Sequence, residues 1–338
     1  MKNIVYIAKD FAPSVALRAV ANECAVQGYT HQDYFGGDFS KANILSSLKS
    51  ADMLISGMGH SAEAADLELY AITSANALGL PIVLYSDTWD CYAREWFSSI
   101  RKLVSLLFVV SESERVDAEP LFPNARIIVS GNPLWESASF PSMTRENVRK
   151  KYNLDDETLA IFLTCGKEMH INLPHIHAVI DAITKNTSKT YPLMVFASIH
   201  PGASNKEQYT EIFSRYSFIE EITGKIVDIL PGMDVVVNAG SGAGIEAVHQ
   251  RIPVIEFTIP AVLDEVERLH GTRVWQLVAD GVALPAHDAL EIAKLLDMAR
   301  EHGNVINAMA IHATEKYPLP KSRDAAVTLM VSEISKMS

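Results

Sequence analysis

A cluster of three glycines and one serine lies between two short apolar runs, at residues 235–237 and 254–257. The cluster consists of Gly240, Ser241, Gly242 and Gly244. Small residues at the end of a strand let a ligand approach the backbone, and the N–H groups that open a helix attract an anion. The chemistry that this pattern indicates is phosphate binding, and the alternative is a tight strand-to-helix turn with no ligand.

Glu246 follows the last of these glycines by two residues and is expected in the first turn of the helix. A carboxylate there is favoured by the helix dipole, and it could instead hydrogen-bond a sugar or ribose hydroxyl. The spacing is not that of the dinucleotide fingerprint GxGxxG, because Ile245 stands where a glycine is needed. The motif therefore indicates a phosphate-binding loop that differs from the first strand-to-helix turn of a dinucleotide-binding Rossmann domain.

Three side chains that could accept a proton each follow a different apolar run of the first 90 residues: Asp10, His60 and Asp87. The carboxyl ends of parallel strands are where ligands bind, so each is a candidate general base. Asp87 is the preferred candidate, because it directly follows its run and shares a turn with Trp89, which could wall an acceptor pocket. The alternative for the two aspartates is that they stabilise a turn or cap a helix. The alternative for His60 is that it is a solvated residue of a turn.

The elements that must position these residues alternate between strand and helix. Strands are expected at 3–8, 30–35, 52–56, 82–85, 106–110 and 126–129, then at 159–164, 193–199, 226–229, 235–237 and 254–257. Such alternation predicts an α/β protein with two Rossmann-like, doubly wound parallel-sheet domains facing a cleft.

The periodic patterns lapse around residues 134–143, where two prolines appear. We therefore expect an N-terminal domain at 1–134, an interdomain hinge at 135–143 and a C-terminal domain at 144–321. A last helix is expected at 322–338, and that it crosses back to the first domain is implied only by the family resemblance described below.

Composition excludes several classes of protein. The 338 residues are 48% hydrophobic and 21% charged, with a net charge of -12, which disfavours a nucleic-acid binder. The three cysteines form no CxxC pair, so neither a disulfide framework nor a zinc site is indicated. With no signal peptide or long apolar run visible, we expect a cytoplasmic protein.

The segment 93–104 places apolar residues on one helical face with basic residues around it. A buried helix with a basic outer face is the favoured interpretation. The alternative is peripheral contact with a membrane or a lipid acceptor through Trp96–Lys102.

Three local patterns carry a resemblance to a known family: Gly131-Asn132-Pro133 before the hinge, the pair His200-Pro201, and the stretch 241–246. Together with the two-domain layout they resemble the GT-B glycosyltransferases and their sugar-nucleotide epimerase relatives. The resemblance covers the whole chain in layout, and it is narrower residue by residue.

The resemblance implies that the C-terminal half binds a nucleotide-sugar donor and that the N-terminal half binds an unidentified acceptor and carries the base, one of Asp87, Asp10 and His60. The donor residues would be Gly166, Lys167, His200, Pro201, Ser241, Gly242, Gly244 and Glu246. No metal or cofactor is implied, in agreement with the absence of a DxD pair, and the nucleotide sugar is a substrate.

The implied activity is metal-independent sugar transfer to a glycan, lipid-linked or small-molecule acceptor, as in the biosynthesis of cell-surface polysaccharides. Two alternatives remain. One is a nucleotide-sugar 2-epimerase or hydrolase, and the other is a non-catalytic nucleotide-sugar-binding protein.

Overall fold

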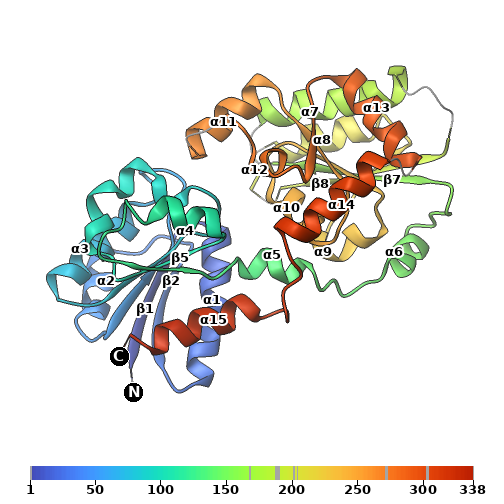
Figure 1. Ribbon diagram of the computed structural model, residues 1–338. Coiled ribbons are helices and arrows are strands. Elements are labelled where there is room, and N and C mark those ends of the chain that lie inside the picture. Colours follow the sequence, from blue (N-terminus) through green and yellow to red (C-terminus); the bar gives the residue numbers. More distant parts are fainter. Residues whose placement is uncertain are drawn as a thin grey trace. The chain divides into compact units, whose positions relative to one another are not determined.

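The computed structural model describes residues 2–166, 169–186, 191–200, 202–203, 205–270, 273–301 and 304–337. The chain divides into two compact units (Figure 1). Most of unit 1 comes from Met1–Glu136 and Lys321–Ser338, and most of unit 2 from Ser137–Arg268 and Thr272–Pro320.

Unit 1 is built on a parallel sheet of six strands in the order β2-β1-β3-β4-β5-β6. The strands are β1 (Asn3–Ala8), β2 (Thr30–Phe35), β3 (Met53–Ser56), β4 (Ile82–Tyr85), β5 (Leu106–Val109) and β6 (Arg126–Val129). The central strands β1, β3, β4 and β5 are almost wholly buried, as expected for a parallel sheet that is covered on both faces.

Helices cover both faces of this sheet. The helices are α1 (Phe11–Val26), α2 (Lys41–Leu48), α3 (Asp66–Ala77), α4 (Glu112–Ala118), α5 (Pro133–Ala138, which ends in unit 2) and α15 (Ala325–Ser335), with 3-10 turns η1 (Cys91–Ala93) and η2 (Glu95–Leu103). Alternate strand residues point to opposite faces, so Ile4 and Tyr6 pack against α1 and α15, whereas Val5 and Ile7 pack on the side of α2 and α3. The C-terminal helix α15 lies beside α1 (Figure 1).

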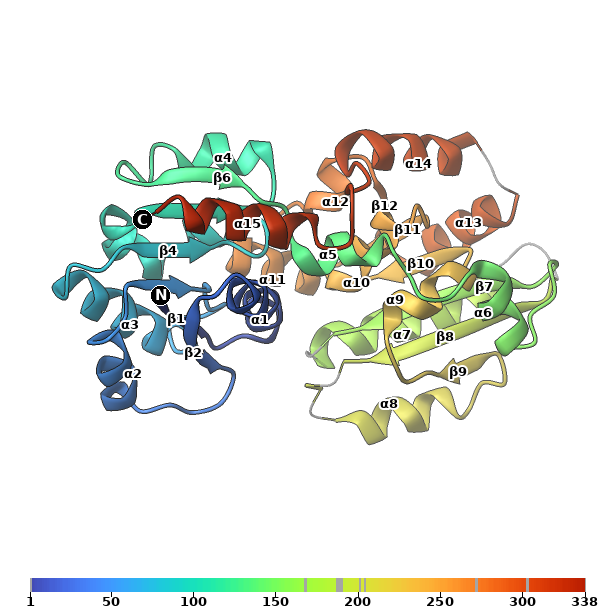
Figure 2. The ribbon, with the colours of Figure 1, turned by 90° about the horizontal axis from the view of Figure 1, so that it is seen from below.

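Unit 2 has a second six-stranded parallel sheet in the order β12-β11-β10-β7-β8-β9 (Figure 2). Its strands are β7 (Leu159–Cys165), β8 (Leu193–Ile199), β9 (Ile219–Glu221), β10 (Val235–Asn238), β11 (Val254–Phe257) and β12 (Ala283–Ala286). The prediction of two Rossmann-like, doubly wound domains is confirmed.

The helices of unit 2 alternate with these strands. They are α6 (Arg145–Lys151), α7 (Met169–Asp181), α8 (Lys206–Phe213), α9 (Ile226–Ile229), α10 (Gly242–His249), α11 (Pro260–His270), α12 (Gln276–Ala279), α13 (Ala289–Arg300) and α14 (Asn304–Lys316), with a π-helical turn η3 (Ala182–Asn186) and a 3-10 turn η4 (Leu230–Gly232). Apolar residues of α7 and α13 share a core with the sheet, for example Ile176 and Leu296.

One predicted strand is wrong, and two strands were not predicted. The run 226–229 forms the short helix α9 rather than a strand, because the edge position it would occupy is taken by β9 and because Pro231 and Gly232 follow in a 3-10 turn. β9 was not predicted because it has only three residues, two of which are acidic. β12 contains Pro285, which an edge strand tolerates.

Candidate functional site

Each sheet has one topological switch point, at which the strand order reverses. It lies between β1 and β3 in unit 1 and between β7 and β10 in unit 2. In doubly wound folds ligands bind outside the carboxyl ends of the strands at this point. Functional residues are therefore expected on the loops that follow these four strands.

Asp10 follows β1 and His60 follows β3, so the two residues flank the switch point of unit 1. Oδ2 of Asp10 accepts a hydrogen bond from the backbone N–H of His60 at 2.7 Å. The two carboxylate oxygens lie 2.8 and 2.9 Å from Nδ1 of His60. The fold thus joins two of the three predicted proton acceptors into one Asp–His pair.

The pair has the geometry of a general base. A carboxylate only accepts hydrogen bonds, so Nδ1 of His60 carries the proton and Nε2 of the neutral ring keeps a lone pair. The His60 side chain is 45% exposed and that of Asp10 21%. Burial alone would raise the pKa of Asp10, but the hydrogen bonds and charge of His60 outweigh burial and lower it. An imidazole oriented by a carboxylate in this way can take a proton from a hydroxyl group.

Side chains that the sequence did not single out fix the loop that carries His60. Nη1 of Arg94 donates hydrogen bonds to the carbonyls of Met58 at 2.6 Å and Gly59 at 3.1 Å. Nε1 of Trp96 donates to the same Gly59 carbonyl at 3.1 Å. A Cβ on Gly59 would lie 2.8 Å from a backbone nitrogen, so only glycine fits there.

Asp87, the third candidate, is buried and is not hydrogen-bonded to the pair. Its Oδ1 accepts a hydrogen bond from Sγ of Cys91 at 3.5 Å, and its carbonyl accepts one from Nδ2 of Asn132 at 2.5 Å. Burial raises the pKa of Asp87 to about 6, against the lowering effect of the Arg94 charge. Trp89 is also buried, and its ring packs on that of Trp135 with centroids 4.8 Å apart. These contacts favour a structural role for the Asp87 turn.

In unit 2 the glycine-rich loop is tied to the strands on either side of the switch point. Asn238, the last residue of β10, accepts a hydrogen bond from Oγ1 of Thr164 on β7 at 2.7 Å. Its Nδ2 donates to Oε2 of Glu256 at 2.8 Å, and the other oxygen of Glu256 accepts from the backbone N–H of Gly240 at 2.5 Å. Burial raises the pKa of Glu256 to about 7, opposed by these two hydrogen bonds. A buried polar network therefore sets the shape of the loop.

The glycines of this loop have different physical roles. A Cβ on Gly244 would lie 2.5 Å from Nδ2 of Asn238, so glycine is needed for helix α10 to approach the network. A Cβ on Gly242 would meet no atom of the described residues within 4 Å. Ser241 caps the helix, because its hydroxyl accepts a hydrogen bond from the N–H of Ala243 at 3.4 Å. The open space beside Gly242, at the start of α10, is where an anion would meet backbone N–H groups.

Comparison with known proteins is informative at the level of structure alone. No model of a known protein family matches the chain, and no curated protein matches its sequence. A putative UDP-N-acetylglucosamine 2-epimerase from Listeria monocytogenes has a TM-score of 0.69 at 12% identity, covering 99% of this chain and 96% of that one. MurG of Acinetobacter baumannii has a TM-score of 0.63 at 14% identity, with 100% of both chains covered. The chain has a GT-B fold.

A third GT-B structure of similar layout was determined with ligands. HepE of Anabaena, in complex with UDP and glucose, has a TM-score of 0.62 at 10% identity and covers 100% of this chain and 99% of that one. At such low identity the likeness establishes the GT-B architecture and leaves activity to be argued from the residues of this chain.

Gly166 and His200 follow the neighbouring strands β7 and β8 of this GT-B chain. The N–H and carbonyl of Gly166 are both hydrogen-bonded to the side-chain amide of Asn172, each at 2.8 Å. Nδ1 of His200 accepts a hydrogen bond from the N–H of Gly202 at 2.9 Å, so the proton of the neutral ring lies on Nε2. Two further predicted residues, Lys167 and Pro201, lie outside the described residues.

Glu246 lies in the second turn of α10, since the helix begins at Gly242, and the expectation that it occupies the first turn is wrong. Its side chain is partly buried, and burial raises its pKa to about 7. In the described part of the chain no hydrogen-bond donor contacts its carboxylate. Ser241 rather than Glu246 caps this helix, and a ligand role for the Glu246 carboxylate remains a prediction.

The suggested membrane contact through Trp96–Lys102 is corrected by the packing of η2. Phe97 and Ile100 are buried in the core of unit 1, and Trp96 packs against the same core. The helix therefore presents no apolar face to a lipid surface. Separately, none of the described helices is both long and apolar enough to span a bilayer.

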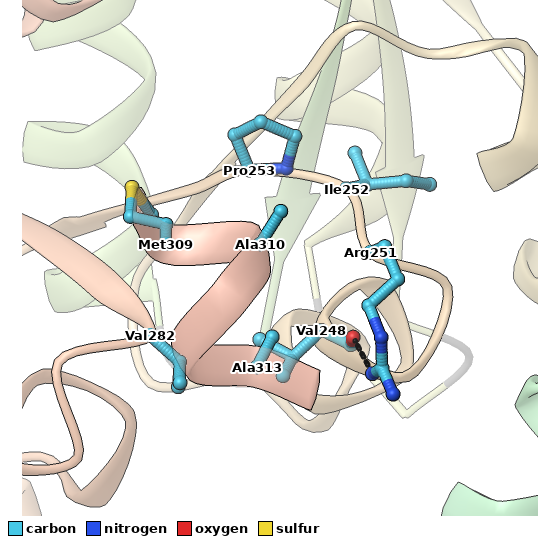
Figure 3. A pocket seen from close by; sticks show the side chains of 8 residues that line it. All are labelled: Val248, Arg251, Ile252, Pro253, Val282, Met309, Ala310 and Ala313. Carbon is cyan, nitrogen blue, oxygen red and sulfur yellow. Dashed lines mark hydrogen bonds between the residues drawn. The ribbon is translucent and has the colours of Figure 1, made fainter. Parts of the chain in front are cut away.

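Two hollows open at the amino edge of the second sheet, opposite the glycine-rich loop. The smaller one, of about 10 Å³, is lined by Pro253, Met309 and Arg251, whose guanidinium donates to the Val248 carbonyl at 2.9 Å (Figure 3). A space of this size holds about one water molecule. The larger hollow, of about 800 Å³, is shallower, and its Arg145 is already bonded within unit 2.

Proposed function

We propose that the protein is a glycosyltransferase that moves a sugar from a nucleotide-sugar donor to a hydroxyl group of a glycan, lipid-linked or small-molecule acceptor. The observation that carries the proposal is the Asp10–His60 pair at the switch point of unit 1, within a GT-B fold. Its oriented imidazole supplies a base for a hydroxyl proton. Unit 2 supplies a matching seat for phosphate at its own switch point.

In the proposed reaction the acceptor oxygen forms a bond to the anomeric carbon of the donor sugar. The bond from that carbon to the donor phosphate breaks, and its electron pair stays on the phosphate. The hydroxyl proton passes to Nε2 of His60, and the resulting imidazolium is stabilised by the Asp10 carboxylate. Asp87 has no part in this step, because its carboxylate is buried against Cys91.

The charge that develops on the leaving phosphate requires hydrogen-bond donors. N–H groups at the start of α10, beside Gly242, and the Nε2–H of His200 are the donors that we assign to it. The carboxylate of Glu246 would accept a hydrogen bond from a hydroxyl of the ribose or the sugar. Since these donors are groups of the protein itself, the proposed mechanism uses no metal ion.

We further propose that residues 1–134 bind the acceptor and carry the base, that residues 144–321 bind the donor, and that residues 135–143 form a hinge between the two domains. Within the turn before this segment, Oδ1 of Asn132 accepts hydrogen bonds from the N–H groups of Leu134 and Trp135. Asn132 thereby caps α5.

A nucleotide-sugar 2-epimerase or hydrolase is the second candidate, because a putative 2-epimerase is among the structures that match this fold. Such an enzyme needs no acceptor. The one argument for transfer over this candidate is that the Asp10–His60 pair can remove a proton from an acceptor hydroxyl. A direct assay is therefore required.

The proposal is tested by incubating the protein with a panel of nucleotide sugars and measuring released nucleotide, with and without extracts that contain acceptors. Release that depends on an acceptor supports transfer. Release or epimerisation without an acceptor supports the second candidate, and binding without turnover contradicts both.

A further inference from the structure

Glu68 lies in the first turn of α3, and its side chain is fully buried. Oε1 accepts a hydrogen bond from the backbone N–H of Lys9 at 3.0 Å, and Oε2 accepts one from the N–H of Gly59 at 2.6 Å. Lys9 immediately precedes Asp10, and Gly59 immediately precedes His60. One carboxylate therefore joins the two loops whose next residues form the Asp–His pair.

A carboxylate at this position is costly, which argues that its two hydrogen bonds matter. Burial raises the pKa of Glu68 to about 7, although the two N–H groups act in the opposite direction. An apolar side chain would avoid this penalty but would leave two buried N–H groups without an acceptor. Only an acceptor with two oxygens meets both loops at once.

We propose that Glu68 is a positioning residue for the Asp10–His60 pair, holding the β1 and β3 loops at the separation at which the carboxylate reaches Nδ1 of the imidazole. This inference rests on the proposed function for its catalytic consequence, and the geometry of the pair can be measured independently of any activity. Glu68 touches neither substrate nor proton. It acts through the two loops.

Unit 1 offers a matched control for this role. Glu114 in α4 is also buried, and its two oxygens accept hydrogen bonds from the N–H groups of Asp90 at 2.8 Å and Val110 at 2.9 Å. These N–H groups belong to the loops after β4 and β5, which do not carry the pair. Replacement of either glutamate removes a buried carboxylate that joins two loops. Only Glu68 joins the loops that carry Asp10 and His60.

The substitution Glu68→Gln keeps the shape of the side chain but turns an NH2 group toward a backbone N–H, so one loop loses its acceptor. The first readout is the pKa of Asp10, followed by carboxyl ¹³C NMR. Glu68, with a pKa of about 7, is protonated over the range in which Asp10 titrates, so its replacement by glutamine alone would leave the pKa of Asp10 unchanged, whereas loss of the His60 contact would raise it. The proposal therefore predicts a rise in Glu68→Gln and no such rise in Glu114→Gln.

The second readout is turnover. A misplaced base lowers kcat by about tenfold to a hundredfold, with KM for the donor little changed. Glu114→Gln is expected to lose stability to a similar extent and to keep its kcat. If Glu68→Gln does not fold, Glu68→Asp, which is one methylene shorter and cannot reach both loops, replaces it in both measurements.

The outcomes separate the two proposals. A fall or no change in the pKa of Asp10 in folded Glu68→Gln overturns the positioning role, whatever the activity. If the pKa of Asp10 rises in Glu68→Gln but the wild-type protein transfers no sugar, the positioning role is supported and the proposed function is contradicted.

Discussion

Asp10 and His60 are 50 residues apart in sequence, yet the carboxylate of Asp10 contacts both the backbone N–H and Nδ1 of His60 within 2.9 Å. The contact follows from the strand order, because β1 and β3 are hydrogen-bonded neighbours and each residue lies just beyond the carboxyl end of its strand. The switch point of the sheet thus places the Asp–His pair, our proposed base, where a ligand is expected.

Substitution Gly242→Val tests the phosphate seat. The new side chain would meet no protein atom of the described residues, so the melting temperature should stay close to that of the wild type. It would occupy the space beside the start of α10, and nucleotide affinity measured by calorimetry should fall by about tenfold or more. Unchanged affinity in the folded variant would show that the ligand binds elsewhere. Gly244→Ala is the contrasting variant, since its Cβ would lie 2.5 Å from Nδ2 of Asn238 and should lower stability.

Glu246→Gln tests the carboxylate that lacks a protein donor. No described hydrogen bond is lost and a buried ionisable group is removed, so the free energy of unfolding should be equal to or higher than that of the wild type. If the carboxylate binds a ribose or sugar hydroxyl, donor affinity should fall by about tenfold or more, because a hydrogen bond to a charged group is worth about 1.5 to 3 kcal/mol. A variant that loses stability but binds donor normally would contradict the ligand role.

The strand order and the Asp–His pair show what sequence could and could not provide. Ten of the eleven predicted strands are present, and most of them could be recognised because strands buried in a parallel sheet are apolar along their whole length. Asp10 and His60 were separately placed at strand ends, but their contact depends on which strands are neighbours. That order is a property of the whole sheet.

Residues that act through backbone groups were missed for a related reason. Glu68 and Glu256 accept hydrogen bonds from N–H groups that lie 59, 9 and 16 residues away in sequence. A glutamate in a helix or a strand gives no local indication of such a partner. Asn238 offered a weak signal, since a polar residue that ends a buried strand needs hydrogen-bond partners.

Stability should fall as the pH rises from about 5 to about 8. Burial raises the pKa of Glu68 to about 7, of Glu114 to about 8 and of Glu256 to about 7, above the ordinary value near 4.5. The folded state therefore binds these protons more tightly than the unfolded state. Their contribution is complete below the ordinary pKa and is lost as the pH rises through the raised values, at about 1.4 kcal/mol per unit of pKa difference.

Denaturant unfolding at pH 5, 6, 7 and 8 measures this slope. Glu256→Gln removes one of the three groups and should flatten the curve between pH 5 and pH 7. A free energy of unfolding that rises over this range would mean that the hydrogen bonds to the carboxylates outweigh their burial.

Chelation tests the proposed use of neutral donors at the leaving phosphate. The helix start and His200 stabilise the charge without a cation, so turnover should be unchanged after dialysis against EDTA. A complete loss that manganese or magnesium restores would contradict the metal-independent mechanism.

The central claim is tested most directly by His60→Ala, compared with Glu291→Gln as a matched control. Glu291 accepts hydrogen bonds from the N–H of His287 and contacts its Nδ1, both at 2.8 Å, so a similar His–carboxylate contact is removed away from the switch points. With the donor bound to an extent confirmed by calorimetry, acceptor-dependent release of nucleotide should fall by about a hundredfold to ten-thousandfold in His60→Ala and stay near the wild-type rate in Glu291→Gln. A His60→Ala protein that binds donor and transfers sugar at the wild-type rate would contradict the account.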